Sequence, residues 1–435
     1  MAETLRLGDH CEKIGSGATP RGGKETYSDD GPIALIRSQN IYNDHFSHGG
    51  LAFISQEQAA QLQNVEVKEG DVLLNITGDS VARACQVDPT VLPARVNQHV
   101  AIIRPRPGQI DARFLRYYIV TPSVQAHMLG LAAAGATRNA LTKSMIEGFR
   151  VPAWPVESQR AIAAVLGALD DKIELNRRMN ETLEAMARAI FRDWFVTFGP
   201  TRAKQEGRAP YLAPDIWSLF PDALDEDGKP EGWIERPLTA FFSIIGGGTP
   251  KTSIADYWNG DIPWFSVTDT PSQGSVFVVG TEKTITKKGI EKSSARLVPA
   301  GSTIISARGT VGNLAMAGQC MTFNQSCYGL RGVDNVGECF VFLAAQNMVG
   351  RLQSMAHGSV FSTITRQTFE AITLAAPPRR VLEVFEETVQ PLFAKIKVNV
   401  IESSTLSTIR DLLLPKLMSG EVRVKDAEKI VEEVT

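Results

Sequence analysis

The chain has 435 residues, 43% hydrophobic residues and a formal net charge of −3, which allows roughly two to four globular domains and excludes a disordered chain. No apolar run approaches the roughly 20 residues that cross a bilayer, and the N-terminal residues lack the pattern of a secretion signal. The five cysteines are scattered and form no CxxC pair, which suits a reducing compartment and argues against structural zinc. We therefore expect a cytoplasmic protein with no membrane partner.

Charge is distributed evenly enough to leave the partner class open. Counted by segment, residues 1–150 and 231–376 are close to neutral, and the remaining segments are slightly acidic. This composition does not demand a nucleic acid, although a neutral lobe can still gather its basic side chains on one face. If DNA is the ligand, a partner that neutralises most of the phosphates would fit.

Residues 1–156 are predicted to form a first α/β lobe with short strands. Apolar runs of strand length occur at 33–36 and 72–76, and a helix-period pattern covers 111–131. Glycines and a proline between residues 15 and 23 mark a loop.

A long helix is predicted within residues 157–199, because apolar side chains recur there on alternating three- and four-residue steps. Gly199 and Pro200 are expected to end it, since glycine accepts a left-handed cap and proline cannot continue the hydrogen-bond ladder. The predicted seam of this helix consists of Ile162, Leu166, Leu169, Ile173, Asn176, Leu183 and Ile190.

Residues 200–232 are rich in proline and acidic side chains, and this composition predicts an exposed linker. The first lobe then begins again, so that 233–378 form a second lobe. GATP at 17–20 returns as GGTP at 247–250, and Asn-Gln at 97–98 returns at 324–325. Further matches pair 33–36 with 262–265, 70–74 with 301–305, and Gly135 and Leu141-Thr142 with Gly358 and Ile364-Thr365.

A second long helix is predicted within residues 379–420, because the same seam reappears 223 positions later. Pro415 is expected to kink or end this helix, and the charged tail 421–435 is expected to fray. The second seam consists of Phe385, Val389, Leu392, Ile396, Asn399, Leu406 and Leu413.

Two matched helices predict a pair. About 37 residues give a helix roughly 55 Å long, which is more than a small lobe can bury. Asn176 and Asn399 would fix the register of the pair, because slippage leaves a buried amide unpaired; the alternative is that both lie on a solvated flank. The expected fold class is α/β, with two repeated α/β target-recognition lobes separated by two long antiparallel coiled-coil helices in a pseudo-twofold internal repeat.

Motifs for catalysis are absent from the sequence. An amino-methyltransferase needs an Asx/Ser-Pro-Pro-aromatic tetrad, and the nearest match, APPR at 376–379, lacks both the polar and the aromatic residue. GxGxxG, GxxxxGK[ST] and GxSxG do not occur. Asp44, His45 and His48 suggest a metal site, but turn residues are the better interpretation because no fourth ligand is apparent.

The arrangement resembles the specificity subunit of Type I restriction–modification enzymes. The resemblance covers essentially the whole chain and is carried by QRAIAAVLGALDDKIELNRRMNETLEAMARAIFRDWFV, RDLLLPKLMSGEV and the paired GATP/GGTP, VLLNITGD and FNQ segments. It implies that each lobe reads one half of a bipartite double-stranded DNA target, with the helices as a spacer. Two DNA methyltransferase subunits would dock on this scaffold, and restriction/translocase subunits would join them in a restricting complex. S-adenosylmethionine, ATP and Mg would bind those partners, leaving this chain without a cofactor, metal or catalytic residue.

Two groups of residues are candidate contacts. DNA reading needs hydrogen-bonding side chains on loops, where backbone contacts position the protein and base contacts specify the sequence. The DNA candidates are Thr19, Arg21, Lys24, Arg37, Gln39, Asn40, Thr77, Arg83, Thr137, Arg138 and Asn139 in the first lobe, and Thr249, Lys251, Thr268, Arg308, Asn313, Ser362 and Arg366 in the second. The candidates for docking a methyltransferase lie off the helix seam and are Glu174, Arg177, Arg178, Glu181 and Arg188.

Asn97-Gln98 and Asn324-Gln325 are interpreted as structural, because amides often brace turns through backbone hydrogen bonds. Two other hypotheses remain beside DNA specificity. One is a repeat-built protein–protein scaffold without DNA specificity, and the other is an enzyme with an unrecognised site.

Overall fold

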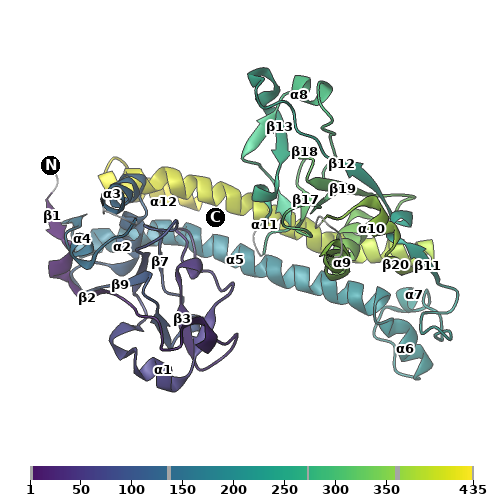
Figure 1. Ribbon diagram of the computed structural model, residues 1–435, viewed down its shortest axis with the longest axis horizontal. Helices are drawn as coiled ribbons and strands as arrows, with labels where there is room; N and C mark the ends of the chain where they lie inside the picture. Colours follow the sequence, from purple (N-terminus) through teal and green to yellow (C-terminus); the bar gives the residue numbers. More distant parts are fainter. Residues whose placement is uncertain (1–2, 135–138, 272–273, 358–362, 434–435) are drawn as a thin grey trace. The chain divides into compact units, whose positions relative to one another are not determined.

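The computed structural model describes residues 3–134, 139–271, 274–357 and 363–433, apart from the side chains of Lys24, Ala356 and His357. The chain divides into two compact units, one formed by residues 1–172 and 405–435 and the other by 173–404. Each unit contains one α/β lobe and part of each of two long helices, α5 (Val156–Phe195) and α11 (Arg379–Ser419) (Figure 1).

The first lobe is built, within its described residues, from two four-stranded sheets and a two-stranded ribbon. The first sheet has the order β2 (Cys11–Ser16), β9 (Val100–Pro105), β6 (Val72–Asn75) and β7 (Ala84–Gln86). The second has the order β4 (Ala52–Ile54), β3 (Ile33–Ile36), β8 (Ala94–Val96) and β5 (Glu66–Val67), with β3 and β8 parallel. The ribbon pairs β1 (Thr4–Arg6) with β10 (Arg150–Pro152). The helices are α1 (Gln56–Ala60), α2 (Ala112–Ile119), α3 (Pro122–Ala133) and α4 (Lys143–Glu147).

The second lobe repeats this plan in the part of 233–378 that the structure describes. A five-stranded sheet has the order β12 (Phe242–Gly246), β19 (Cys327–Gly332), β16 (Thr303–Ser306), β17 (Leu314–Ala317) and β14 (Phe277–Val278). A three-stranded sheet has the order β15 (Lys283–Ile285), β13 (Trp258–Phe265) and β18 (Thr322–Phe323), and β11 (Ile234–Pro237) pairs with β20 (Thr373–Ala376). The helices are α8 (Lys287–Glu291), α9 (Glu338–His357) and α10 (Arg366–Glu370).

Strand pairing confirms the repeat that the sequence predicts. β2 and β6 flank β9 in the first lobe, and β12 and β16 flank β19 in the second, all in antiparallel pairs. The two lobes therefore have equivalent loops between equivalent strands. Those loops carry the doubled sequence motifs.

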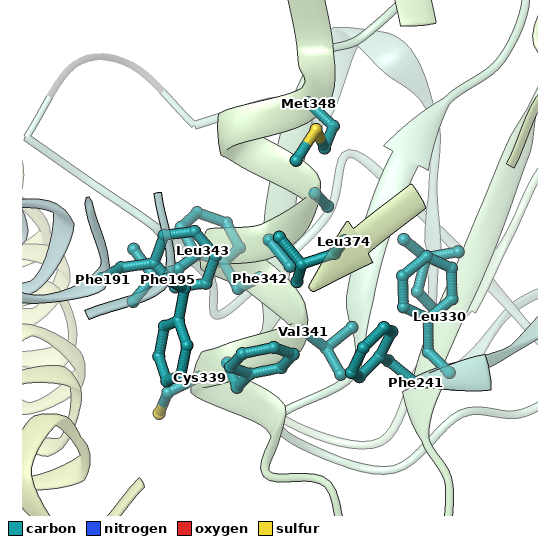
Figure 2. Close-up of a cluster of buried hydrophobic side chains, with 14 of the residues drawn as sticks. Phe191, Phe195, Phe241, Leu330, Cys339, Val341, Phe342, Leu343, Met348 and Leu374 are labelled. Carbon is teal, nitrogen blue, oxygen red and sulfur yellow. The ribbon is translucent and has the colours of Figure 1, made fainter. Parts of the chain in front are cut away.

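The second unit has an aromatic core where the end of α5 meets the lobe. Phe191 and Phe195 point toward α9 and the sheet (Figure 2), and the Phe195 and Phe340 rings meet edge to face with centroids 5.2 Å apart. Packing of this kind adds roughly 0.5–1.5 kcal/mol per pair beyond area burial. The lobe is thus joined to its own stretch of helix by a continuous core.

The seam residues of both helices are inside their units. Of the predicted set, Ile162, Leu166, Leu169, Asn176, Phe385, Val389, Ile396, Asn399, Leu406 and Leu413 are buried, and Ile173, Leu183, Ile190 and Leu392 are half-buried. Asn176 Nδ2 donates to Ser403 Oγ at 3.3 Å, and Asn399 Nδ2 donates to Asn180 Oδ1 at 2.8 Å. Successive contacts move forward along α5 and backward along α11, so the helices run antiparallel in the second unit (Figure 1).

Prolines do not interrupt the second helix. Both Pro391 and Pro415 lie inside α11, which continues to Ser419. The expected stop at Pro415 is therefore wrong. A proline removes one backbone hydrogen bond, and in this helix the buried seam on either side maintains the helical path.

Segments predicted as polar connectors are ordered as well. The left-handed residue after α5 is Phe198, with φ of 53°, and Gly199 begins the next helix, α6 (Gly199–Gln205). After α7 (Pro214–Trp217), Phe220 is buried against Trp194, with ring centroids 5.2 Å apart, so 200–232 is not simply an exposed linker. The tail forms α12 (Val424–Glu432) with Ala427 and Val431 buried, because its apolar residues recur at helical spacing.

The repeat is not perfect in the core beside the helices. In the first unit Asp170 accepts hydrogen bonds from Arg116, Tyr117 and Arg410 at 2.8, 2.6 and 2.8 Å. The position related by 223 residues is Phe393, whose ring lies 5.7 Å from that of Phe342. One lobe thus rests on a charged network and the other on aromatic packing.

Within the described residues, no helix is long and apolar enough to span a membrane.

Candidate nucleic-acid interface

In each lobe a glycine lies where two loops pack closely against each other. A Cβ on Gly17 would lie 1.7 Å from the carbonyl oxygen of Val96, and one on Gly247 would lie 2.0 Å from that of Asn324. Only glycine permits so close an approach of two backbones. The GATP and GGTP loops are thereby held against the two Asn-Gln turns.

Asparagine braces each of these turns. Asn97 Oδ1 accepts a hydrogen bond from the His99 backbone N–H at 3.0 Å, and Asn324 Oδ1 accepts one from Ser326 at the same distance. Such a side-chain-to-backbone bond holds the turn locally. The structural role predicted for the two asparagines is confirmed.

The glutamine that follows each asparagine points outward instead. Gln98 and Gln325 are exposed, and each accepts a hydrogen bond at Oε1 from the threonine of the opposite loop, Thr19 in the first lobe and Thr249 in the second. The structural interpretation therefore holds for the asparagines alone. The repetition of the Asn-Gln dipeptide in both lobes was the sequence signal that could have identified the glutamines as candidate DNA contacts.

A third loop joins this arrangement in both lobes. The backbone N–H of Ile76 donates to His99 at 3.0 Å, and that of Ala307 donates to Ser326 at 2.7 Å. Thr77 and Arg308 follow directly and occupy equivalent isolated bridges, to Ala140 and Thr363. We call residues 17–20, 76–77 and 97–99 the first loop cluster, and 247–250, 307–308 and 324–326 the second.

The two clusters differ in their polar side chains. In the first, Thr77 Oγ1 lies 2.6 Å from His99 Nδ1, and Gln98 Nε2 lies 3.0 Å from His99 Nε2. In the second, Arg308 and Ser326 stand at the positions of Thr77 and His99. The second cluster therefore presents an exposed arginine where the first has a chain of hydrogen-bonded side chains.

Among the predicted DNA contacts that the structure describes, four come together in these clusters, namely Thr19, Thr77, Thr249 and Arg308. Arg37 and Gln39 both donate to the Gly50 carbonyl, in a separate loop of the first lobe. The Arg83 guanidinium lies 5.1 Å from the Tyr42 ring centre. The remaining described candidates lie on other segments, with Arg21, Asn139, Lys251, Thr268 and Arg366 exposed and Asn313 half-buried.

Asn40 has a structural role. It is completely buried; its Oδ1 accepts from the Arg37 backbone at 3.0 Å, and its Nδ2 donates to the Ser47 carbonyl at 2.9 Å. The amide is committed to holding its own loop, so the expectation that Asn40 reads a base is corrected. Thr137, Arg138 and Ser362 lie outside the described residues, as does the side chain of Lys24.

The predicted docking residues form ion pairs along α5. Arg177 binds Glu174 at 2.7 Å and Glu181 at 2.6 Å, and Arg178 binds Glu174 at 2.6 Å. Burial would raise the pKa of Glu174, but the hydrogen bonds and charges of Arg177 and Arg178 hold it below its ordinary value. Arg178 and Arg188 keep 57% and 53% of their side-chain surface exposed, and are the more accessible members.

Part of this helix face is already covered. Asn180 Nδ2 donates to the Gly274 carbonyl at 3.1 Å, and a Cβ on Gly274 would lie 2.8 Å from Arg177 Cγ. The second lobe's own loop therefore contacts α5 beside Arg177 and Glu181. The exposed side chains of Arg178 and Arg188 are therefore more accessible to a partner than those of Arg177 and Glu181.

The histidines near residue 45 have separate partners. His45 Nδ1 lies 2.9 Å from Asp44, and His48 Nε2 lies 2.9 Å from Asp88. Among the residues that the structure describes, no group of three or more His, Cys, Asp or Glu could hold a metal ion.

Comparison with known proteins decides the family. The model of the Type I restriction modification DNA specificity domain matches residues 2–185 and 230–397. The chain belongs to this family. Each matched span contains one lobe and the first part of one long helix, so the chain carries two target-recognition domains in tandem.

Curated relatives extend over most of the chain. It is 26% identical to the Type I restriction enzyme HindI specificity subunit of Haemophilus influenzae, over 90% of this chain and 94% of that protein. It is also 26% identical to the MjaIX specificity subunit of Methanocaldococcus jannaschii, over 77% and 74%. The crystal structure of a Type I restriction–modification S subunit from M. genitalium has a TM-score of 0.55 at 14% identity, covering 96% of both chains, which supports the fold.

Proposed function

We propose that each lobe of this specificity subunit reads one half of a bipartite double-stranded DNA target through its loop cluster. The supporting observation is that the same three loops converge in both lobes, through the same glycine approach and the same Thr-Gln contact. Exposed hydroxyl, amide and guanidinium groups on such loops are the usual donors to phosphates and base edges.

The helix pair sets the number of unread base pairs between the half-targets. Buried amide contacts Asn176 to Ser403 and Asn180 to Asn399 support a single register, and a fixed register gives a fixed length. The exposed arginines of α5 contribute to docking two methyltransferase subunits. Restriction/translocase subunits join through the same assembly.

The chain performs no chemistry itself under this proposal. S-adenosylmethionine, ATP and Mg are held by the partner subunits, and this chain recognises the target sequence on the DNA. The family membership supports a non-catalytic role, because the relatives carry the name of specificity subunits.

Methylation mapping tests the proposal. The full chain is co-expressed with the modification subunits of its own operon in a methylation-free host, and methylated bases are sequenced. We expect one bipartite motif with a constant gap, which disappears when this chain is omitted. Absence of any motif, with the subunits co-purifying normally, would support the alternative of a protein–protein scaffold without DNA specificity.

Matched heptad insertions test the spacer. Seven residues are added to α5 between Asn176 and Asn180 and seven to α11 between Asn399 and Ser403, which preserves the seam. The added length is about 10 Å, or roughly three base pairs at 3.4 Å each, so the gap should lengthen by about that number. A heptad in α5 alone is the control and should abolish assembly, whereas an unchanged gap in the double insertion contradicts the spacer role.

Charge reversal tests docking. Arg178→Glu with Arg188→Glu should reduce co-purification of the methyltransferase subunits and leave the fold unchanged. Arg160→Glu is the matched control, because Arg160 is equally exposed on α5 and pairs with Glu157 in the same way. An equal loss of co-purification in the double variant and in Arg160→Glu would contradict a docking role for Arg178 and Arg188.

A further inference from the structure

The two loop clusters share one pair of side chains and differ in another. This contrast carries information if the lobes read different half-targets, a premise that rests on the proposed function. Contacts common to both lobes cannot distinguish two base sequences. They suit what every half-target has in common, which is the sugar–phosphate backbone.

The common pair is the threonine–glutamine contact. Thr19 with Gln98 and Thr249 with Gln325 make the same hydrogen bond between the same two loops. The fold does not need this contact, because the glycine approach and the asparagine brace already hold the turn. An exposed hydrogen bond between side chains adds little stability, since water competes for both groups.

The side chains that differ between the lobes lie on equivalent backbone positions. Thr77 and Arg308 occupy equivalent bridges, and the residues beside them are His99 and Ser326. Leu141 donates to the Ile76 carbonyl at 2.8 Å in one lobe, and Ile364 to that of Ala307 at 3.0 Å in the other. The frame is kept while the side chains change, which is the pattern expected of positions that select a sequence.

We propose that Gln98 and Gln325, each held by its threonine, bind the DNA backbone in both half-targets, and that positions 77 with 99 and 308 with 326 select bases. Arg308 presents a planar pair of donors that matches O6 and N7 of guanine. Thr77 and His99 form a hydrogen-bonded pair of different shape and donor pattern, which suits a different base. The half-target of the second lobe therefore contains a guanine that the Arg308 side chain reads.

Base selection is tested by Arg308→Thr, which copies the first lobe's residue into the second. Methylation mapping of the assembled complex should show relaxed preference at one guanine of one half-target, by roughly tenfold or more, with the other half unchanged. Arg296→Thr is the control, because Arg296 is an exposed arginine of the same lobe outside the cluster. An unchanged motif, or uniform weakening across both halves, overturns the role of position 308.

Backbone binding is tested by Gln98→Ala and Gln325→Ala. Each variant should weaken binding of the complex to target duplex roughly three- to tenfold while the methylated motif stays the same. Gln109→Ala and Gln319→Ala are controls, since both glutamines are exposed and make hydrogen bonds away from the clusters. A changed motif, or affinity equal to the controls, overturns this part.

The experiments distinguish failure of the proposed function from failure of the assignment of position 308. A wild-type complex that methylates no bipartite motif contradicts the proposed function itself. A normal wild-type motif that survives Arg308→Thr contradicts only the assignment of position 308.

Discussion

Asn399 donates a hydrogen bond from Nδ2 to Oδ1 of Asn180 over 2.8 Å, and both side chains are at least 97% buried. Its pseudo-symmetric counterpart joins Asn176 to Ser403, since 223 residues separate Asn176 from Asn399 and Asn180 from Ser403. The sequence predicted that Asn176 and Asn399 set the register. Both side chains are buried and each donates a hydrogen bond to the other helix, so neither lies on a solvated flank; their role in setting the register stays a prediction.

Truncating this pair should cost stability. Asn399→Ala leaves the Asn180 oxygen buried without its donor, and we expect the free energy of unfolding to fall by about 1–3 kcal/mol in urea denaturation. Val398→Ala is the control, because that side chain is 55% exposed. A double-mutant cycle with Asn180→Ala should give a coupling energy above about 0.5 kcal/mol; strict additivity would contradict the register role.

The charged network beneath the first lobe gives a larger expected effect. Asp170 is 15% exposed and pairs with Arg410, itself 13% exposed, and with Arg116, 7% exposed. Asp170→Ala should destabilise the chain by about 3–5 kcal/mol, because the buried Arg116 loses its carboxylate and Arg410 keeps only the exposed Asp411. Asp411→Ala removes the other carboxylate of Arg410, at 2.9 Å but 65% exposed, and should cost less than about 1 kcal/mol. Similar losses in both variants would show that burial does not govern this network.

The glycine approach predicts a position-specific steric cost. Gly17→Ala and Gly247→Ala should each lower the free energy of unfolding by about 1–3 kcal/mol or more, because backbone atoms cannot move aside. Gly15→Ala and Gly246→Ala are matched controls two residues and one residue away, where an added Cβ meets nothing within 4 Å. Thermal unfolding of all four variants checks the prediction, and equal melting temperatures would contradict it.

Cysteine reactivity provides a check on folding for every variant. Cys11, Cys85, Cys327 and Cys339 are buried and Cys320 is exposed. Burial raises the pKa of Cys11, Cys85 and Cys327 to about 12, so little thiolate is present at pH 8. We expect one rapidly reacting thiol in the native protein and five in denaturant; several fast thiols in the native state would contradict the buried cores.

Periodicity alone was enough to predict the helix pair and the repeat. A seam of seven residues that recurs in two segments requires a long buried stripe in each, and doubled loop motifs require equivalent strands. These signals are local, because they depend on side chains spaced along one element. The DNA candidates stay predictions, and the sequence could not show which of them lie together, since loop residues of similar type occur both inside and outside the clusters.

Tertiary structure decided which polar groups are used and how. The amides of Asn40 and Asn97 brace backbone, whereas Gln98 beside Asn97 faces solvent, and no feature of composition separates these three residues. The prolines of α11 are tolerated because packing on either side offsets one lost hydrogen bond. Position 170 is aspartate where position 393 is phenylalanine, and only the surrounding arginines make that charge stable. The sequence by itself determined the periodic elements and their duplication; the partners of each buried or exposed polar group depended on residues distant in the chain that folding brings together.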